Sequence, residues 1–299
     1  MPFLLSPFPV SFARPGSEGL EMTLPLSIRH VQIEVNGTDF DIAVGSHESD
    51  ANFATGLTIV WVHGLGNAST TTFREISLHP ALDGWPSVLI DLPGSGHSPA
   101  PEDWNATIEE VADIVLATIT RLDLSPVVLF GHSMGGSVAI AAAQRRPDLI
   151  RHLVVAEPNL YPGMGTTSAA IARQAERTFV STGFRNLVQA AERLARQGNH
   201  AAARWLLTLR ETHPTTLHRL SSSLLAPRTP TFREMVGALP MPVTFISGER
   251  SGDRGSAPQP RAGLAGYVVS DAGHQMFDDN PDAFAAILAG LVGETPSER

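Results

Sequence analysis

A serine that could act as a nucleophile lies in the stretch FGHSMGG, residues 130–136. Within it, Gly131 to Gly135 form the pattern G-x-S-x-G between an apolar, strand-like run and a segment with helical character. A sharp turn from strand to helix needs glycines on both sides of the serine, and it leaves the hydroxyl exposed at the helix N-terminus. Ser133 is therefore predicted to be the nucleophile of an acyl-transfer reaction.

A serine hydroxyl needs a base within hydrogen-bond reach before it can attack a carbonyl group. His274 is the candidate base, because it lies in the stretch DAGHQMFDDNPDAF between an expected strand and the last helix. A histidine in this role is oriented by a carboxylate, which also stabilises the imidazolium form. Three residues are candidates for that carboxylate: Glu157, Glu249 and Asp253.

The elements that would position these residues follow an α/β pattern. An alternating stretch around Asn36-Gly37 predicts an antiparallel hairpin. Continuous apolar runs, typical of strands buried on both faces, follow at 57–62, 86–91, 126–131, 152–157, 242–248 and 265–271. Helices are expected over 105–124 and 280–293. Strands that alternate with helices predict a mostly parallel sheet with helices on both faces.

Residues 159–239 have a different character. They contain helical segments and no convincing strand, and they carry ten arginines and four glutamates, a net charge of +6. The rest of the chain carries eleven arginines and 26 acidic residues, a net charge of −15. A basic helical insertion between two strands is expected to form a cap. The expected organisation is a flexible N-terminal extension at 1–27, a core at 28–158 and 240–299, and the cap at 159–239.

The composition excludes several kinds of site. The chain has no cysteine, and all 21 of its basic side chains are arginines. Disulfides, thiolate metal sites, cysteine nucleophiles, lysine Schiff bases and Walker-type phosphate loops are therefore excluded. The net charge of −9 argues against nucleic-acid binding, and no apolar run is long enough to span a membrane. Because the first 20 residues lack a basic segment and are interrupted by prolines, we expect a cytoplasmic protein, with secretion as the less favoured alternative.

Four motifs in one order resemble the α/β-hydrolase family, and the resemblance covers nearly all of the chain after about residue 28. Besides the serine motif, HGLG at 63–66 is similar to the family's oxyanion loop, and DLPGSGHS at 91–98 is similar to its turn after the next strand. The stretch around His274 is similar to the segment that bears the family's histidine. The resemblance implies an α/β-hydrolase fold with an inserted helical cap.

The resemblance also implies the roles of individual residues. Ser133 would be the nucleophile and His274 the general base and acid. The oxyanion of the tetrahedral intermediate would be bound by the backbone N–H groups of Leu65 and Met134, so that these two side chains could vary without loss.

In the loop after the expected strand at 242–248, the position where the family usually has its acid holds no carboxylate. Family members place the acid after one of two strands, here the strand at 152–157 or the strand at 242–248. In the loop after the second strand, an aspartate normally follows a glycine by three residues. Here Gly248 is followed at that distance by Ser251. Asp253 would fit only in a longer loop, and the position of Glu249 next to the strand leaves its direction open.

Glu157, at the end of the earlier strand, is the better candidate. It follows Ser133 by 24 residues and lies at the carboxyl edge of the expected sheet, where catalytic groups gather. Pro158 favours an extended backbone at Glu157, which would direct its side chain towards the cleft. We therefore expect Glu157 to be the orienting acid, with Asp253 as the alternative.

These roles predict a serine hydrolase that cleaves a small-molecule carboxylic ester or lactone through an acyl-enzyme, without a metal or organic cofactor. Epoxide hydrolases and dehalogenases of this fold need aspartate at the nucleophile position, so Ser133 argues against both. Carbon–carbon bond hydrolases, cofactor-free haloperoxidases and acyltransferases keep the same triad and remain alternatives. A slow-turnover receptor of the same fold is a further alternative.

The cap would roof the cleft and set the shape of the substrate. Five of its apolar residues either line the cleft or form a core, which is the commoner place for apolar residues at helical spacing: Met164, Phe179, Phe184, Trp205 and Met235. Its arginines suggest two hypotheses. They pair with carboxylates of the body and hold the cap down, which we favour, or they attract a substrate that bears a carboxylate.

Overall fold

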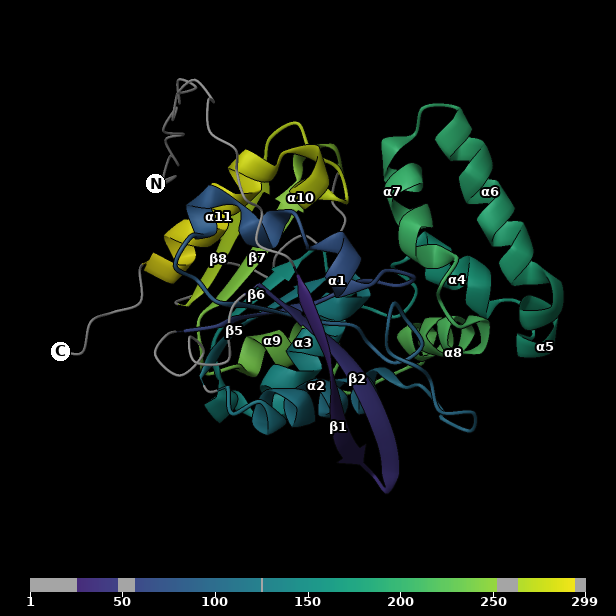
Figure 1. Cartoon of the computed structure of the whole chain (residues 1–299), viewed down its shortest axis with the longest axis horizontal. Helices are drawn as coiled ribbons and strands as arrows, with labels where there is room; N and C mark the ends of the chain where they lie inside the picture. The colour runs from purple at the N-terminus through teal and green to yellow at the C-terminus, as the bar shows by residue number, and fades with distance from the viewer. Residues whose placement is uncertain (1–25, 48–56, 125, 252–262, 294–299) are drawn as a thin grey trace.

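A single eight-stranded sheet runs through the part of the chain that the computed structural model describes, which is residues 26–47, 57–124, 126–251 and 263–293 (Figure 1). The strands are β1 (Ser27–Val35), β2 (Thr38–Ser46), β3 (Ile59–Val62), β4 (Ser87–Ile90), β5 (Val127–His132), β6 (Ile150–Ala156), β7 (Val243–Gly248) and β8 (Leu264–Val269). Their order is β1-β2-β4-β3-β5-β6-β7-β8. Most of the expected N-terminal extension lies outside the described residues.

The sheet combines an antiparallel hairpin with a parallel body. Asn36 and Gly37 both have positive φ, 51° and 77°, as a two-residue hairpin turn requires, and β1 pairs with β2 in antiparallel register. β2 also lies antiparallel to β4, whereas the pairs from β4 through β3, β5, β6 and β7 to β8 are parallel. The mostly parallel sheet expected from the sequence is confirmed.

Helices cover both faces of the sheet. Because side chains along each strand alternate between the two faces, each strand contributes to a core on either side. Val60 and Val62 of β3 belong to one core, and Ile59 and Trp61 belong to the core on the opposite face. The first core packs under α2 (Ile108–Arg121), α3 (Met134–Arg145) and α9 (Phe232–Ala238), and the second under α11 (Pro281–Gly293). Figure 1 shows these two groups of helices on opposite sides of the strands.

Five further helices stand beside this body, at the right of Figure 1. They are α4 (Thr166–Ala172), α5 (Glu176–Thr178), α6 (Phe184–Arg196), α7 (His200–Leu209) and α8 (Pro214–Leu225). They share a small core of their own, which includes Phe179, Leu209 and Leu217. α8 also places Leu224 in the core of the body, and α9 packs against α3 with its Phe232 in the same core.

The helical stretch at the start of the cap is interrupted between α4 and α5, where His218 of α8 donates a hydrogen bond to the Gln174 carbonyl at 2.8 Å. Short elements complete the chain: α1 (Ser69–Thr72), α10 (Met276–Asp279), 3₁₀ turns at Ile76–Leu78, Pro80–Leu82, Pro147–Leu149 and Glu249–Ser251, and a π-helical turn at Phe179–Gly183. None of the helices in the described segments is long and apolar enough to cross a membrane.

Candidate active site

Ser133 occupies a strained turn between β5 and α3. Its φ of 53° and ψ of −120° are unusual for a residue with a side chain, and such a conformation costs about 1–3 kcal/mol. The Ser133 N–H donates to the Ala156 carbonyl at 2.8 Å, which ties the turn to the end of β6. A Cβ atom on Gly131 would lie only 2.3 Å from the Gly135 carbonyl oxygen, so the turn needs the glycines that the motif supplies.

His274 and Glu157 are hydrogen bonded to each other. His274 Nδ1 lies 2.5 Å from Glu157 Oε2, and the Glu157 side chain is only 1% exposed. The second carboxylate oxygen, Oε1, accepts from the Gly248 N–H at 2.9 Å. Burial alone would raise the pKa of Glu157, but its hydrogen bonds with His274 and Gly248 outweigh that effect and hold the pKa below its ordinary value. The carboxylate is therefore ionised at neutral pH and directs the other ring nitrogen of His274 away from itself.

The backbone at Glu157 corrects one expectation. Its φ is 44°, so Glu157 is not extended, although Pro158 follows it. The Glu157 N–H donates to the Ile246 carbonyl at 3.1 Å, and its side chain is held at both oxygens. These hydrogen bonds outweigh the local preference for an extended backbone before proline. Strained residues therefore follow two neighbouring strands, Ser133 after β5 and Glu157 after β6.

The loop after β7 supports the site from behind. Ser251, which stands where many family members have the acid, has a buried hydroxyl close enough to Glu157 to contribute to lowering its pKa, although the two make no well-formed hydrogen bond. The Glu249 carboxylate accepts from the Asp271 N–H at 2.9 Å and so braces the histidine loop. The alternative acid, Asp253, lies outside the described residues.

The loop that carries His274 is fixed by several hydrogen bonds. Asp279 Oδ2 accepts from the Gly273 N–H at 2.7 Å, and Arg250 Nη2 reaches the same carboxylate oxygen at 3.2 Å. On the inner side, His132 Nε2 donates to the His274 carbonyl at 2.8 Å. The main chain of the candidate base is thus held on both sides.

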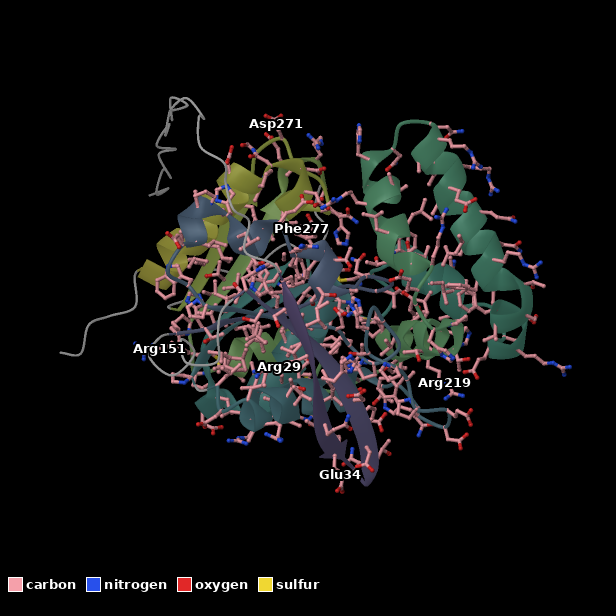
Figure 2. The ribbon with its side chains drawn as sticks, viewed as in Figure 1. Arg29, Glu34, Arg151, Arg219, Asp271 and Phe277 are labelled. Atoms are coloured by element: carbon pink, nitrogen blue, oxygen red, sulfur yellow. The ribbon has the colours of Figure 1, made fainter. Side chains whose placement is uncertain are left out.

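His132 is a structural neighbour of the nucleophile, and the sequence does not reveal its contact with the His274 main chain. Its ring lies 4.6 Å from the His274 ring and 5.1 Å edge-on from Phe277, which Figure 2 labels. Burial, assisted by the nearby His274, lowers the pKa of His132 to about 3, so it remains neutral. Its Nδ1 atom has no partner and faces Gly64. Only its place beside the nucleophile serine could have drawn attention to it.

The loop after β3 lies directly against the nucleophile. A Cβ on Gly64 would be 3.2 Å from Ser133 Cβ. His63 Nδ1 donates to the Gly64 carbonyl at 2.8 Å, and His63 Nε2 accepts from the Leu92 N–H at 3.0 Å. Because burial lowers the pKa of His63, the neutral ring can serve as donor and acceptor at once. His63 therefore locks the loop that contains Leu65 to the end of β4.

The candidate residues meet at one cavity of about 640 Å³. Ser133, His274, Glu157 and Leu65 all line it. Met134 follows Ser133 as the first residue of α3, so its N–H has no acceptor within the helix. No hydrogen bond between Ser133 and His274 occurs among the described residues; catalytic hydrogen bonds of this kind often tighten only when substrate is bound.

The cap contributes two of the five apolar residues considered for the cleft. Met164 and Trp205 line the cavity. Phe179 is fully buried in the core of the cap, and Phe184 packs against that core. Met235, on α9, lies in the core of the body. Three of the five residues are thus core residues, which is the commoner place that the sequence analysis gave for them.

Cap arginines bind groups of the body, as the favoured hypothesis expects. Arg204 of α7 lies 2.9 Å from Asp278, and Arg228, after α8, lies 2.7 Å from Glu109 of α2. Figure 2 shows Arg219 on α8, where it donates to a main-chain carbonyl of the body. Among the described residues, no arginine lines the cavity that contains Ser133. The hypothesis of a carboxylate-bearing substrate therefore gains no support from these residues.

A second cavity of about 620 Å³ lies beside the first, between cap and body. Glu75, His79 and Arg204 line it, and it shares Gln275 with the cavity of Ser133. Neither cavity contains a cluster of three or more metal-ligating side chains within the described segments.

Known proteins with similar sequences include several hydrolases. An esterase of Mycobacterium tuberculosis is 27% identical over 257 residues, which cover 78% of this chain and 82% of the relative. A 2-succinyl-6-hydroxy-2,4-cyclohexadiene-1-carboxylate synthase of Klebsiella pneumoniae is 27% identical over 245 residues, 78% of this chain and 93% of the relative. An uncharacterized hydrolase of Bacillus subtilis is 33% identical, but the match spans only 35% of that protein.

Solved structures share the fold. An esterase from Thermogutta terrifontis superposes with a TM-score of 0.71 at 20% identity and covers 89% of this chain and 98% of that one. An N-acyl homoserine lactonase gives a TM-score of 0.70 at 22% identity and covers 91% and 99%. A family model described as the alpha/beta hydrolase family matches residues 59–287. Because this match spans most of the chain, and the sheet and the serine turn agree with it, the protein belongs to the alpha/beta hydrolase family.

Proposed function

We propose that this protein hydrolyses a small-molecule carboxylic ester or lactone through an acyl-enzyme on Ser133. In this proposal His274 is the general base and acid, and Glu157 is the acid that orients it. The single observation that carries the proposal is the 2.5 Å hydrogen bond from His274 to the buried Glu157, at a cavity that Ser133 also lines. Esterases and lactonases among the similar proteins support the same class of reaction.

The first half of the reaction acylates the serine. His274 Nε2 takes the proton from Ser133 Oγ while Oγ attacks the carbonyl carbon of the ester. Negative charge develops on the carbonyl oxygen, and the N–H groups of Leu65 and Met134 are the proposed donors that stabilise it. His274 then gives its proton to the departing alkoxide, which leaves as an alcohol.

The second half releases the acid. A water molecule loses a proton to His274 and attacks the acyl carbon, and the proton returns to Ser133 Oγ as the carboxylic acid departs. With a lactone, the alcohol and the acid stay in one molecule, so the product is a hydroxy acid. Throughout, the ionised Glu157 stabilises the imidazolium of His274, and its low pKa suits this role.

The test is labelling and turnover together. A fluorophosphonate should label the wild-type protein at Ser133, and a panel of esters of graded acyl length, aliphatic and aromatic lactones and a vinylogous diketone should reveal turnover. Ser133→Ala should lose labelling and at least about 1,000-fold in kcat/KM. Ser181→Ala, which changes an exposed serine of the cap, is the matched control and should retain both.

Each negative result points to a different alternative. A folded wild-type protein that does not react with the fluorophosphonate would contradict the assignment as a serine hydrolase and would favour a ligand-binding receptor. Labelling at Ser133 with turnover of the diketone alone would favour a carbon–carbon bond hydrolase and contradict the ester or lactone assignment.

A further inference from the structure

The loop beside Ser133 contains a β-turn at residues 64–67, which we call the oxyanion turn. The Asn67 N–H donates to the Gly64 carbonyl at 3.2 Å, which closes the turn. Gly66, the third residue, has a φ of +72°, and a positive φ at this position requires glycine in most turns of this type. The turn holds Leu65, whose N–H is the proposed oxyanion donor.

The carbonyls of the oxyanion turn are held by two different parts of the molecule. The body holds the first, because the Gly64 carbonyl accepts from His63 Nδ1 at 2.8 Å. The cap holds the next two through helix α7. Trp205 Nε1 donates to the Leu65 carbonyl at 3.1 Å, and Thr208 Oγ1 donates to the Gly66 carbonyl at 2.9 Å.

These contacts from α7 are close, and the contact of Thr208 is fully buried. A Cβ on Gly66 would lie 2.8 Å from Trp205 Nε1, so the tryptophan ring rests directly on the turn. Thr208 is 1% exposed. Its single hydroxyl proton has two other acceptors, the Trp205 carbonyl at 3.1 Å and Asn67 Oδ1 at 3.3 Å, but the Gly66 carbonyl is the nearest.

Holding these carbonyls fixes the N–H groups of the turn. In a planar trans peptide the C=O and N–H bonds point in opposite directions, so a carbonyl that is tied outward directs the N–H of the same peptide inward. His63 orients the peptide whose N–H belongs to Leu65. Trp205 and Thr208 hold the following two peptides and so prevent the turn from rotating about Leu65.

We propose that α7 of the cap completes the oxyanion hole, with Trp205 and Thr208 as positioning residues for the Leu65 N–H. The inference rests on the proposed function, because it assigns these residues to the stabilisation of a developing oxyanion. Docking of the cap and assembly of the oxyanion hole are then one event. A cap displaced from the body would leave Ser133 and His274 in place but would release the turn.

The inference predicts where the kinetic loss will occur. Interactions that strengthen only in the transition state affect kcat, whereas uniform binding affects KM. Deleting an oxyanion donor outright costs about 100-fold to 1,000-fold in kcat. Trp205→Phe and Thr208→Val remove a hydrogen bond that positions the donor but leave the donor itself. We therefore expect about a tenfold loss of kcat in each, with KM nearly unchanged.

Two inhibitors separate this role from a merely structural one. A trifluoromethyl ketone adds reversibly to a serine nucleophile and creates an oxyanion, whereas the matching methyl ketone with an unreactive carbonyl only fills the cavity. In Trp205→Phe and Thr208→Val, the inhibition constant of the trifluoromethyl ketone should rise by the same factor by which kcat falls. That of the methyl ketone should stay constant. Thr208→Ser, which restores the hydroxyl, should behave as wild type, and so should Leu207→Ala, a control at a 54% exposed position on the same helix.

The outcomes distinguish this inference from the proposed function. If Ser133→Ala is inactive but Trp205→Phe and Thr208→Val keep their kcat, the role of α7 is overturned and the proposed function stands. Equal weakening of both ketones with a raised KM would also overturn it, because the two residues would then only shape the cavity. Activity retained in Ser133→Ala would instead overturn the proposed function and, with it, this inference.

Discussion

The two walls of the cavity are built in different ways. The body supplies its residues from the ends of buried strands, and both Ser133 and Glu157 have positive φ there. Glu157 is 1% exposed on its side chain and held by two hydrogen bonds. The cap reaches the body through side chains, including Arg204, whose side chain is one-third exposed. The body can carry strain because its core fixes these residues, whereas water can replace a partly exposed contact such as the one between Arg204 and Asp278.

This difference separates chemistry from access. Strained and buried groups hold the reacting atoms in one geometry, which electrostatic stabilisation of a transition state requires. The partly exposed contacts of Arg204 with Asp278 and Glu75, which we call the seam, contribute little to stability and cost little to break. The contacts of α7 with the oxyanion turn differ from the seam, since they join the cap to the proposed oxyanion donor. Substitutions in the body should therefore have larger effects than substitutions at the seam.

Glu157→Gln tests the side of the cavity that the body builds, and it should have the largest effect. The amide cannot hold His274 in the correct tautomer or stabilise its imidazolium, so kcat should fall by about 1,000-fold to 10,000-fold with little change in KM. Steady-state kinetics on the best ester substrate would measure it. Glu249→Gln is the matched control, because this carboxylate only braces the loop at Asp271, and its loss should be smaller than about tenfold.

The opposite pattern would move the acid to the other loop. Near-normal turnover in Glu157→Gln, together with a collapse in Asp253→Asn, would assign the role to the loop after β7. The body would then still carry the chemistry, but through a different strand.

Much of the body was predictable because its signals are local. The apolar runs mark the strands, and the sharp turn at Ser133 needs its glycines wherever the motif occurs in this setting. The absence of an acid at Ser251 directed attention to Glu157, which the structure brings into contact with His274. The expected extended backbone at Glu157 was wrong, because tertiary hydrogen bonds from β7 and His274 override the preference set by Pro158.

The cap was less predictable, because its important contacts join residues far apart in the chain. Trp205 meets the Leu65 carbonyl across 140 positions. Nothing in its own neighbourhood distinguishes a tryptophan that packs from one that donates to a distant loop. For the same reason, helical spacing could not separate Phe179, in the core of the cap, from Met164, at the cavity.

His132→Gln tests whether a buried, neutral histidine in the body makes the stability of the protein depend on pH. The pKa of His132 is about 3 in the folded protein and 6.5 in the unfolded chain. Between these values only the unfolded chain binds the proton, so the wild-type protein loses stability as the pH falls from about 6.5 towards 3. Glutamine does not titrate but can still donate to the His274 carbonyl. Urea unfolding across this range should show that the free energy of unfolding falls with pH less steeply in the variant than in the wild type. The difference in slope should be about 1 kcal/mol for each unit of pH. Parallel curves for the two proteins would show that His132 is not buried as a neutral ring.

Arg204→Gln tests the seam and should have the smallest effect. Arg204 joins α7 to Asp278 at 2.9 Å and to Glu75 at 3.5 Å, but solvent screens a pair at this exposure, so unfolding should become easier by less than about 1 kcal/mol. Because α7 also carries Trp205 and Thr208, loosening it should change kcat and KM by only a few-fold, and the effect should disappear at high salt, which weakens the wild-type pair as well. Thermal unfolding and kinetics at low and high salt would measure both. Arg196→Gln, at a 69% exposed pair within α6, is the control and should change neither. A loss of kcat in Arg204→Gln as large as that in Glu157→Gln would contradict the separation of the two walls, because a seam contact would then control the chemistry.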